Sequence, residues 1–264
     1  MAETGLKDRK AGVVDVLMHR LGMVVEFLAI PGTIKAASRA RKVSVPSLSL
    51  VGRLNSMGAR PRTIVDIGAN AGQFTAACLA YFPTAEVLAI EALPSLKEGL
   101  TALFSGNPRV TVIGKACGAV SEFKTFYQNE YDKSSSFLRL SEKHEQAFPE
   151  ATRTSQIEVE VTTLDRLLQD WRQPQIDLLK LDVQGFEMEV LKGAAESLRV
   201  TRHVLLETSF APLYEGEPTF PEYVRYLHSL GFEFVGPLGF LADPRTGSYL
   251  QMDSLFVNSA LRGS

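Results

Sequence analysis

The chain has 264 residues, of which 45% are hydrophobic and 22% charged, and its formal net charge is −2. This composition predicts a globular protein with a sizeable core, and the small net charge excludes a protein that binds nucleic acid through an overall basic surface. The two cysteines, Cys78 and Cys117, form no C-x-x-C motif or Cys/His cluster. We therefore expect no structural zinc, a reducing environment and a cytoplasmic location.

An apolar stretch at residues 11–30 is about as long as a membrane span. Four of its side chains are costly in hydrocarbon: Asp15, His19, Arg20 and Glu26. Its apolar residues recur three and four positions apart, which predicts an amphipathic helix that ends at Pro31. Residues 1–60 are thus expected to form a helical extension. It packs on the domain or on the partner of a homodimer, or it makes a peripheral membrane contact near a lipid-linked acceptor.

From residue 61 onward, strand and helix patterns alternate with short connections. The expected strands are 63–68, 85–92, 109–117, 176–183 and 202–208, and the expected helices are 72–82, 94–106, 186–198 and 220–230. Such alternation predicts an α/β fold with a doubly wound parallel sheet. Two further strands, 231–237 and 253–258, have only a loop between them, which predicts a hairpin and an antiparallel C-terminal strand. The domain is expected to span residues 61–264.

A polar insert interrupts this alternation at residues 128–156, between two exposed strands at 122–128 and 157–163. Long loops inside a compact domain are usually lids or binding loops. We expect the insert to bind the substrate, with Ser134, Ser135 and Ser136 as hydrogen-bonding groups. Two aromatic residues outside the insert, Trp171 and Tyr214, are candidates for stacking on a sugar ring, although aromatic side chains more often belong to the core.

The first strand ends in Asp66 and leads into the turn G-A-N-A-G at residues 68–72. Glycine lets the backbone approach a ligand closely, and Asn70 tolerates the left-handed conformation that such a turn needs. The following helix points free N–H groups at a bound ligand. The spacing differs from the G-x-G-x-x-G of dinucleotide sites, and a pyrophosphate would be repelled by Asp66, which could instead accept from a ligand ammonium or from loop amides.

A carboxylate at the end of the second strand, Glu91, lies where doubly wound folds bind a ribose diol. Nicotinamide and adenosyl cofactors share this feature. Together with Asp66, the G-x-N-x-G turn and the antiparallel last strand, it favours S-adenosyl-L-methionine.

The segment "LLKLDVQG" carries the strongest catalytic candidates. Lys180 and Asp182 lie on one side of an alternating strand, with Asp182 at its carboxyl end. There Asp182 is expected to act as a base or to orient a substrate hydroxyl, and Lys180 is expected to pair with it and tune its pKa. The alternative is that Lys180 and Asp182 form a buried ion pair with a purely structural role. Glu207 ends the next strand. Its carboxylate and that of Asp182 suit Mg²⁺, but without a further clear carboxylate neighbour we assign no metal and leave metal dependence open.

Five segments resemble the FkbM-type methyltransferases: "VDIGANAGQF", "AIEALPS", "KSSSF", "VTTLDRLL" and "IDLLKLDVQGFEMEVLKGA". The resemblance covers roughly residues 63–258. It implies a seven-stranded, Rossmann-like class I methyltransferase sheet and S-adenosylmethionine-dependent methylation of a hydroxyl on a sugar, glycolipid or polyketide-type product. One departure is Gln184, where that family often has Glu. The cofactor residues it implies are Asp66, Gly68, Ala69, Asn70, Gly72, Glu91, Ala92 and Ala116.

Two other functions remain open. A nicotinamide-dependent oxidoreductase would need a G-x-G-x-x-G turn and a catalytic Tyr/Lys or His arrangement, and the sequence has neither. A non-catalytic protein that binds an adenosyl ligand on the same fold differs from the enzyme only in activity.

Overall fold

A central mixed sheet organises the molecule. The computed structural model describes residues 29–38, 42–129, 136–138, 154–169, 171, 173–243 and 246–262. Within them the sheet has seven strands, in the order β3 (Val110–Ile113), β2 (Glu86–Ile90), β1 (Thr63–Ile67), β7 (Ile176–Leu181), β8 (Thr201–Ser209), β10 (Tyr249–Asn258) and β9 (Phe232–Ala242). The first five of these strands are parallel, and β10 is antiparallel to both β8 and β9. The expected class I methyltransferase sheet is confirmed, and its antiparallel strand is inserted between β8 and the edge strand β9.

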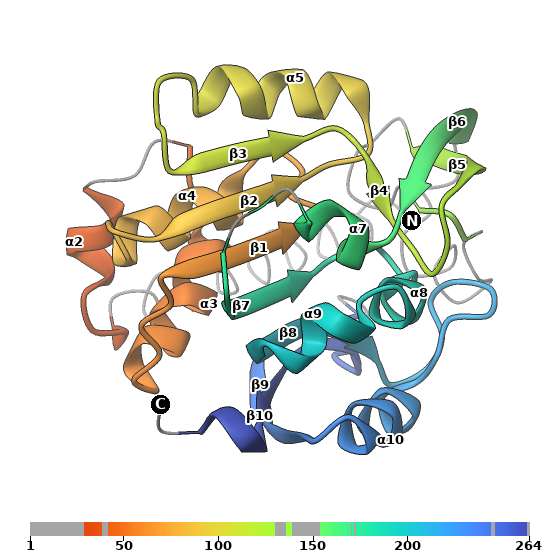
Figure 1. The fold of residues 1–264 in the computed structure, drawn as a ribbon. Coiled ribbons are helices and arrows are strands. Elements are labelled where there is room, and N and C mark those ends of the chain that lie inside the picture. Colours follow the sequence, from red (N-terminus) through yellow and green to blue (C-terminus); the bar gives the residue numbers. More distant parts are fainter. Residues whose placement is uncertain are drawn as a thin grey trace, which may run out of the picture.

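Helices cover both faces of this sheet (Figure 1). One face carries α2 (Thr33–Ala37), α3 (Val45–Ser56), α4 (Gln73–Tyr81) and α5 (Pro94–Leu103). The other face carries α7 (Leu164–Leu168), α8 (Glu187–Lys192), α9 (Ala195–Arg199) and α10 (Phe220–Ser229), and a short 3-10 helix, η2 (Ser259–Leu261), follows β10. Strand β1 is buried on both faces, as expected for a parallel strand between two helical layers.

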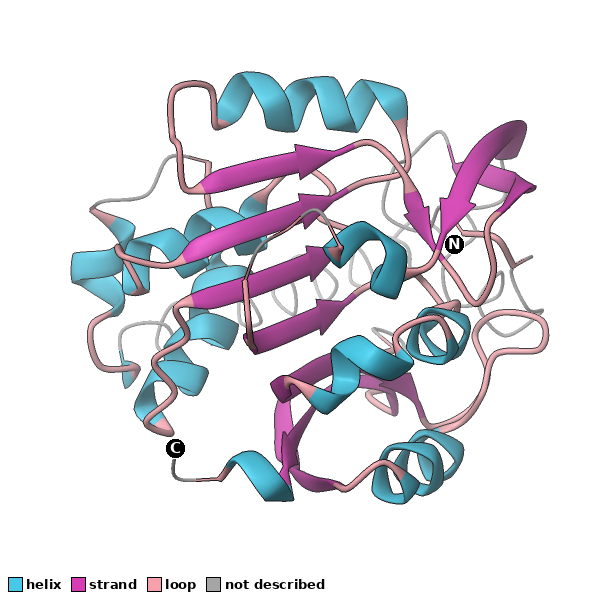
Figure 2. Cartoon of the chain, viewed as in Figure 1, coloured by secondary structure: helices cyan, strands magenta, loops and turns pink. Residues whose placement is uncertain are grey.

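A second, three-stranded sheet stands at the carboxyl edge of the large one. It contains β4 (Ala116–Cys117), β6 (Thr154–Thr162) and β5 (Glu122–Asn129) in that order. Figure 2 shows the arrowheads of the parallel strands pointing toward this small sheet. The exposed strands expected on either side of the polar insert are therefore present. Most of the insert itself, including Ser134 and Ser135, lies outside the described residues.

Three expected elements need correction. Residues 109–117 form two strands, because Ala116 and Cys117 leave the large sheet to pair with β6. Residues 186–198 form two helices, α8 and α9, that break at Gly193, where a Cβ would lie 2.0 Å from the carbonyl oxygen of Gly118. The last hairpin has longer strands and a shorter turn than expected, because the edge strand β9 tolerates Pro237 and its neighbouring glycines.

The helices before residue 60 belong to the same core as the sheet. Leu48, Val51 and Leu54 of α3 are buried against α4 and strand residues such as Ile64 and Leu178. The predicted helix at 11–30 lies almost entirely outside the described residues. In the part of the chain that the structure covers, no helix has the length and apolar character needed to cross a membrane.

Candidate active site at the carboxyl edge of the sheet

The turn after β1 is fixed to the strand ends on both of its sides. The backbone N–H groups of Gly68 and Ala69 both donate to Ile90 O of β2, at 3.0 Å, and the N–H of Asp182 donates to Ile67 O. Gly68 has φ = 75°, and a Cβ there would lie 1.9 Å from the Asp182 carbonyl oxygen. Glycine is therefore required at this position both by its left-handed backbone and by the close approach of the loop after β7.

Glu91 ties the same turn to the end of β2. One carboxylate oxygen accepts from the N–H of Asn70 at 2.8 Å, and the other accepts from the N–H of Leu93 at 2.9 Å. Asn70 has the expected left-handed conformation, with φ = 49°. Burial raises the pKa of Glu91, and the two N–H donors oppose that rise. The carboxylate predicted to bind a ribose thus lies directly against the predicted cofactor turn.

Asp66 and Lys180 face each other on neighbouring strands. Lys180 Nζ lies 3.5 Å from Asp66 Oδ1 and 3.0 Å from Asp182 Oδ2, and Asp66 Oδ2 accepts from the Thr75 hydroxyl at 2.6 Å. Asp66 has no exposed surface, so its partners are Thr75 of α4 and Lys180 rather than the loop amides considered from the sequence. Burial lowers the pKa of Lys180, but Asp182 and Asp66 outweigh it and the net shift is upward.

Three carboxylates form a row across β7, β8 and β10. Leu181 pairs with Leu206 in the register of β7 and β8, which sets Asp182 beside Glu207. Glu207 pairs directly with Asp253 of the antiparallel strand β10. Asp182 and Glu207 were expected from the sequence, and the Lys180–Asp182 contact is present as predicted. Asp253 was missed, although an acidic residue in the apolar strand "DSLFVN" is an unusual feature.

Gln184 connects the first two members of this row. Its Nε2 donates to Asp182 Oδ1 at 2.8 Å and to Glu207 Oε2 at 3.1 Å. The sequence marked Gln184 only as a departure from the residue common in related proteins. Its side chain in fact lies between two members of the acidic row, Asp182 and Glu207.

The acidic groups are crowded and poorly solvated, and their pKa values rise accordingly. Burial raises the pKa of Glu207 well above its usual value, with further increases from Asp182 and Asp253. Burial and Asp182 raise the pKa of Asp253 to about 6. Burial raises the pKa of Glu187, at the start of α8, to about 8. Perturbed carboxyl groups of this kind are typical of functional sites, and structural networks produce them as well.

Other predicted contacts have different partners in the structure. Ser136 is fully buried, and its hydroxyl donates to the carbonyl oxygen of Gln184 at 2.6 Å. Tyr214 is 1% exposed, so its ring cannot stack on a sugar, and Trp171 packs against the core. Asp165 caps the start of α9, because its carboxylate accepts from the N–H of Ser197. Ala116 is buried in β4.

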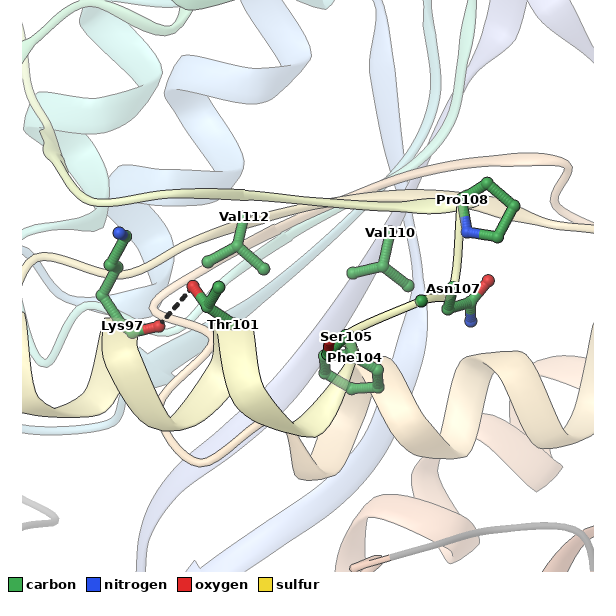
Figure 3. A pocket seen from close by; sticks show the side chains of 9 residues that line it. Lys97, Thr101, Phe104, Ser105, Asn107, Pro108, Val110 and Val112 are labelled. Atoms are coloured by element: carbon green, nitrogen blue, oxygen red, sulfur yellow. Dashed lines mark hydrogen bonds between the residues drawn. The ribbon is translucent and has the colours of Figure 1, made fainter.

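A groove of about 430 Å³ lies elsewhere, between α5 and the edge strand β3. Figure 3 shows Lys97 and Thr101 of α5, and Phe104 just after this helix, facing Val110 and Val112 of β3 across it. The groove is separated from the acidic row by β2 and β1, and it contains none of the predicted site residues. Among the side chains that the structure describes, no three His, Cys, Asp or Glu residues converge to hold a metal ion.

Comparison with known proteins gives the family. A methyltransferase of Sordaria araneosa, sdnD, is 29% identical over 195 residues, which cover 64% of this chain and 73% of the relative. The 2-O-methyltransferase NoeI of Sinorhizobium fredii (strain NBRC 101917 / NGR234) is 35% identical over 88 residues, 33% of this chain and 36% of the relative. A solved magnesium protoporphyrin IX methyltransferase from Synechocystis PCC 6803 covers 81% of this chain and 78% of that one at 12% identity, with a TM-score of 0.47. At this TM-score, the structural likeness supports no conclusion about this protein. The model of the family described as "Methyltransferase FkbM domain" matches residues 66–234, more than half of the chain, and the protein therefore belongs to the FkbM methyltransferase family.

Proposed function

We propose that the protein is an S-adenosyl-L-methionine-dependent O-methyltransferase that methylates a hydroxyl group of a small-molecule acceptor. The observation that carries this proposal is the contact between two loops. The cofactor turn at Gly68 lies directly against the backbone of Asp182, whose carboxylate is held by Lys180 Nζ at 3.0 Å. A methyl donor on the turn and a base on the next loop would therefore be neighbours.

The residues around the turn fit an adenosyl cofactor. The N-cap of α4 is Gly72, and no side chain caps the first N–H groups of this helix. Glu91 keeps lone pairs on both oxygens beyond the two N–H groups that it already accepts. We assign the ribose to Glu91, the methionine portion to the turn with Gly68, Ala69, Asn70 and Gly72, and the adenine to the vicinity of Ala92 and Ala116.

Bound S-adenosylmethionine would supply an activated methyl group on a sulfonium. The work left to the protein is to hold the acceptor hydroxyl in line and to remove its proton. Asp182 is the residue we assign as base, because its side chain is 34% exposed and its carboxylate is oriented by two donors, Lys180 and Gln184. The Lys180 ammonium contacts one oxygen of Asp182 and also the buried Asp66. Glu207 lies beside Asp182, where it can contact the acceptor.

The acceptor class that we propose is a hydroxyl of a sugar, a glycolipid or a polyketide-type product. The name of NoeI, a 2-O-methyltransferase, supports transfer to oxygen. Carboxylates in a row, such as Asp182, Glu207 and Asp253, are suited to accept hydrogen bonds from several hydroxyl groups of one molecule. Ser134 and Ser135 of the polar insert remain proposed acceptor contacts.

Calorimetric titration tests the cofactor assignment. We expect S-adenosylhomocysteine to bind the purified protein and NAD not to bind it, with and without EDTA. Transfer of a tritiated methyl group from S-adenosylmethionine to a panel of methyl glycosides then tests the reaction. Binding of NAD alone, or of neither ligand, would overturn the cofactor assignment. Binding of S-adenosylhomocysteine without transfer to any acceptor would instead favour the non-catalytic alternative.

A further inference from the structure

Gln184 occupies an unusual backbone position. It follows β7 with φ = 56°, and the next residue, Gly185, has φ = 92°. Residues other than glycine adopt the left-handed conformation only at an energetic cost. The conformation turns the Gln184 side chain back toward the ends of β7 and β8, where the two carboxylates of Asp182 and Glu207 lie. A strained backbone of this kind persists only where surrounding contacts stabilise it.

The orientation of the Gln184 carboxamide is defined by its partners. The hydroxyl of Tyr214 donates to Gln184 Oε1 at 2.6 Å, which leaves the Nε2 group to face Asp182 and Glu207. A carboxylate oxygen that accepts a hydrogen bond requires the NH₂ side of the amide. One nitrogen therefore donates one N–H to each carboxylate, at 2.8 and 3.1 Å.

Two contacts hold this arrangement in place from outside. The buried Ser136 hydroxyl donates to the Gln184 carbonyl oxygen at 2.6 Å. The Tyr214 ring lies so close to Gly185 that a Cβ there would be 2.9 Å from the ring. Tyr214 is almost fully buried. The backbone of Gln184 is thus held by Ser136 of the polar insert, and its carboxamide by Tyr214 of the loop after β8.

We propose that Gln184 is a positioning residue whose carboxamide holds Asp182 and Glu207 side by side and fixes the plane of the Asp182 carboxylate for proton removal. Asp182 Oδ2 is bound by Lys180 and Oδ1 by Gln184, so rotation of the carboxylate would break a hydrogen bond on one side or the other. The inference rests on the proposed function for the identity of the reaction. The bridge, by which we mean the two hydrogen bonds from Gln184 Nε2 to Asp182 and Glu207, rests only on the contacts above.

In this chain, the contacts at position 184 are those of a neutral group that both donates and accepts. A Glu at position 184 would keep an acceptor for Tyr214 but would lose both N–H donors and would add a third carboxylate between two others. A Met would keep most of the volume and add no charge. Loss of a donor to a charged carboxylate raises its pKa, as does a neighbouring like charge. Both variants are therefore expected to raise the pKa of Glu207, and the Glu variant more.

The test is an NMR titration of ¹³C-labelled glutamate carboxyl groups in the wild type, Gln184→Met, Gln184→Glu and Tyr214→Phe. We expect the apparent pKa of Glu207 to rise in all three variants, with the smallest rise in Tyr214→Phe, which only frees the carboxamide to rotate. Gln169→Glu, which makes the same change at an exposed residue after α7, is the matched control and should leave the titration unchanged. Affinity for S-adenosylhomocysteine should stay within about twofold, and kcat with a methyl glycoside as acceptor should fall on the order of 10²-fold in Gln184→Met.

An unchanged Glu207 titration in both Gln184 variants would overturn the bridge, whatever the activity. A shifted titration together with wild-type kcat and an unchanged pH–rate profile would overturn its role in positioning the base. Failure of the wild type to transfer a methyl group counts against the proposed function, and the titration decides the bridge independently.

Discussion

Gly68 and Asp182 are in backbone contact, so that a methyl group added at Gly68 would lie 1.9 Å from the Asp182 carbonyl oxygen. The two loops of the site are thus a single packed unit. We expect Gly68→Ala to weaken S-adenosylhomocysteine binding more than tenfold and to lower the free energy of unfolding by more than the roughly 1–3 kcal/mol of left-handed strain alone.

Calorimetry and urea unfolding measure these two effects. Gly58→Ala is the matched control, because Gly58 also has a left-handed φ of 88° but has no atom within 4 Å of the added Cβ. Equal losses of stability in the two variants would mean that the contact between the loops is unimportant.

Glu91→Ala is expected to weaken S-adenosylhomocysteine binding at least tenfold, or about 1.4 kcal/mol. It removes the proposed ribose ligand and also the acceptor for the N–H groups of Asn70 and Leu93. Binding is measured by calorimetry, with Glu98→Ala on the exposed surface of α5 as the control. If both variants bound the ligand like the wild type, Glu91 would not be the ribose ligand.

Asp182→Asn is expected to lower kcat by about 10²- to 10⁴-fold, the usual contribution of a general base, while affinity for S-adenosylhomocysteine changes little. Tritium transfer from S-adenosylmethionine measures the first quantity and calorimetry the second. Asp177→Asn is the control, because it makes the same change at the start of β7, where the carboxylate accepts from backbone N–H groups of residues 62 and 63. Unchanged methyl transfer in Asp182→Asn would refute the assignment of the base and leave the fold and the cofactor site intact.

Lys180→Met is expected to destabilise the protein by about 3–5 kcal/mol, because it leaves Asp66 buried without its cation. The double variant Asp66→Asn/Lys180→Met removes that charge and should recover much of the lost stability without recovering activity, since Asp182 also loses Lys180. Urea unfolding at neutral pH measures the stability of both variants, and tritium transfer measures their activity. Equal stability of Lys180→Met and the wild type would show that the ion pair has little structural importance.

Glu187 gives a pH-dependent prediction. Burial raises its pKa from 4.5 to about 8 in the folded protein, so the folded state holds a proton that the unfolded state releases above pH 4.5. Stability due to this group is therefore full below about pH 4.5 and is lost as the pH rises toward 8, by about 1.4 kcal/mol per pH unit at most. Gln has no proton to lose, so the stability of Glu187→Gln relative to the wild type should increase from pH 5 to pH 8.

Urea unfolding at several pH values measures this trend. Glu196→Gln, at a side chain that is 69% exposed, is the control and should show no comparable trend. A constant difference between Glu187→Gln and the wild type across this range would mean that the buried carboxyl group is ionised throughout.

The sequence predicts the parts of this site that depend on local pattern. Apolar runs with short helical connections specify the parallel strands, and a carboxylate at the end of a strand is necessarily at the carboxyl edge of the sheet. Asp66, Glu91, Asp182 and Glu207 could all be located in this way. The left-handed turn at Asn70 also follows from the residue type.

The remaining features depend on register and on contacts between distant segments. Asp253 faces Glu207 only because β10 runs antiparallel with a particular register, and three register shifts in its pairing with β9 hide that register from the sequence. The break at Gly193 depends on the backbone of Gly118, some 75 residues earlier. The bridge by Gln184 requires Tyr214, which no local pattern connects to it.

The insertion of β10 between β8 and β9 also has a consequence for how the molecule is assembled. Edge strand β9 is synthesised before β10, yet among the strands that the structure describes it pairs with β10 alone. During translation the segment of β9 therefore leaves the ribosome with no strand to pair with, and Glu207 has no facing carboxylate until residue 253 follows. A nascent or proteolysed chain that stops before β10 would expose an unpaired strand and leave β8 as a new free edge of the sheet, which makes it prone to aggregation. Methyl transfer would then appear only in chains whose last strand is in place, so activity would report the completeness of the sheet.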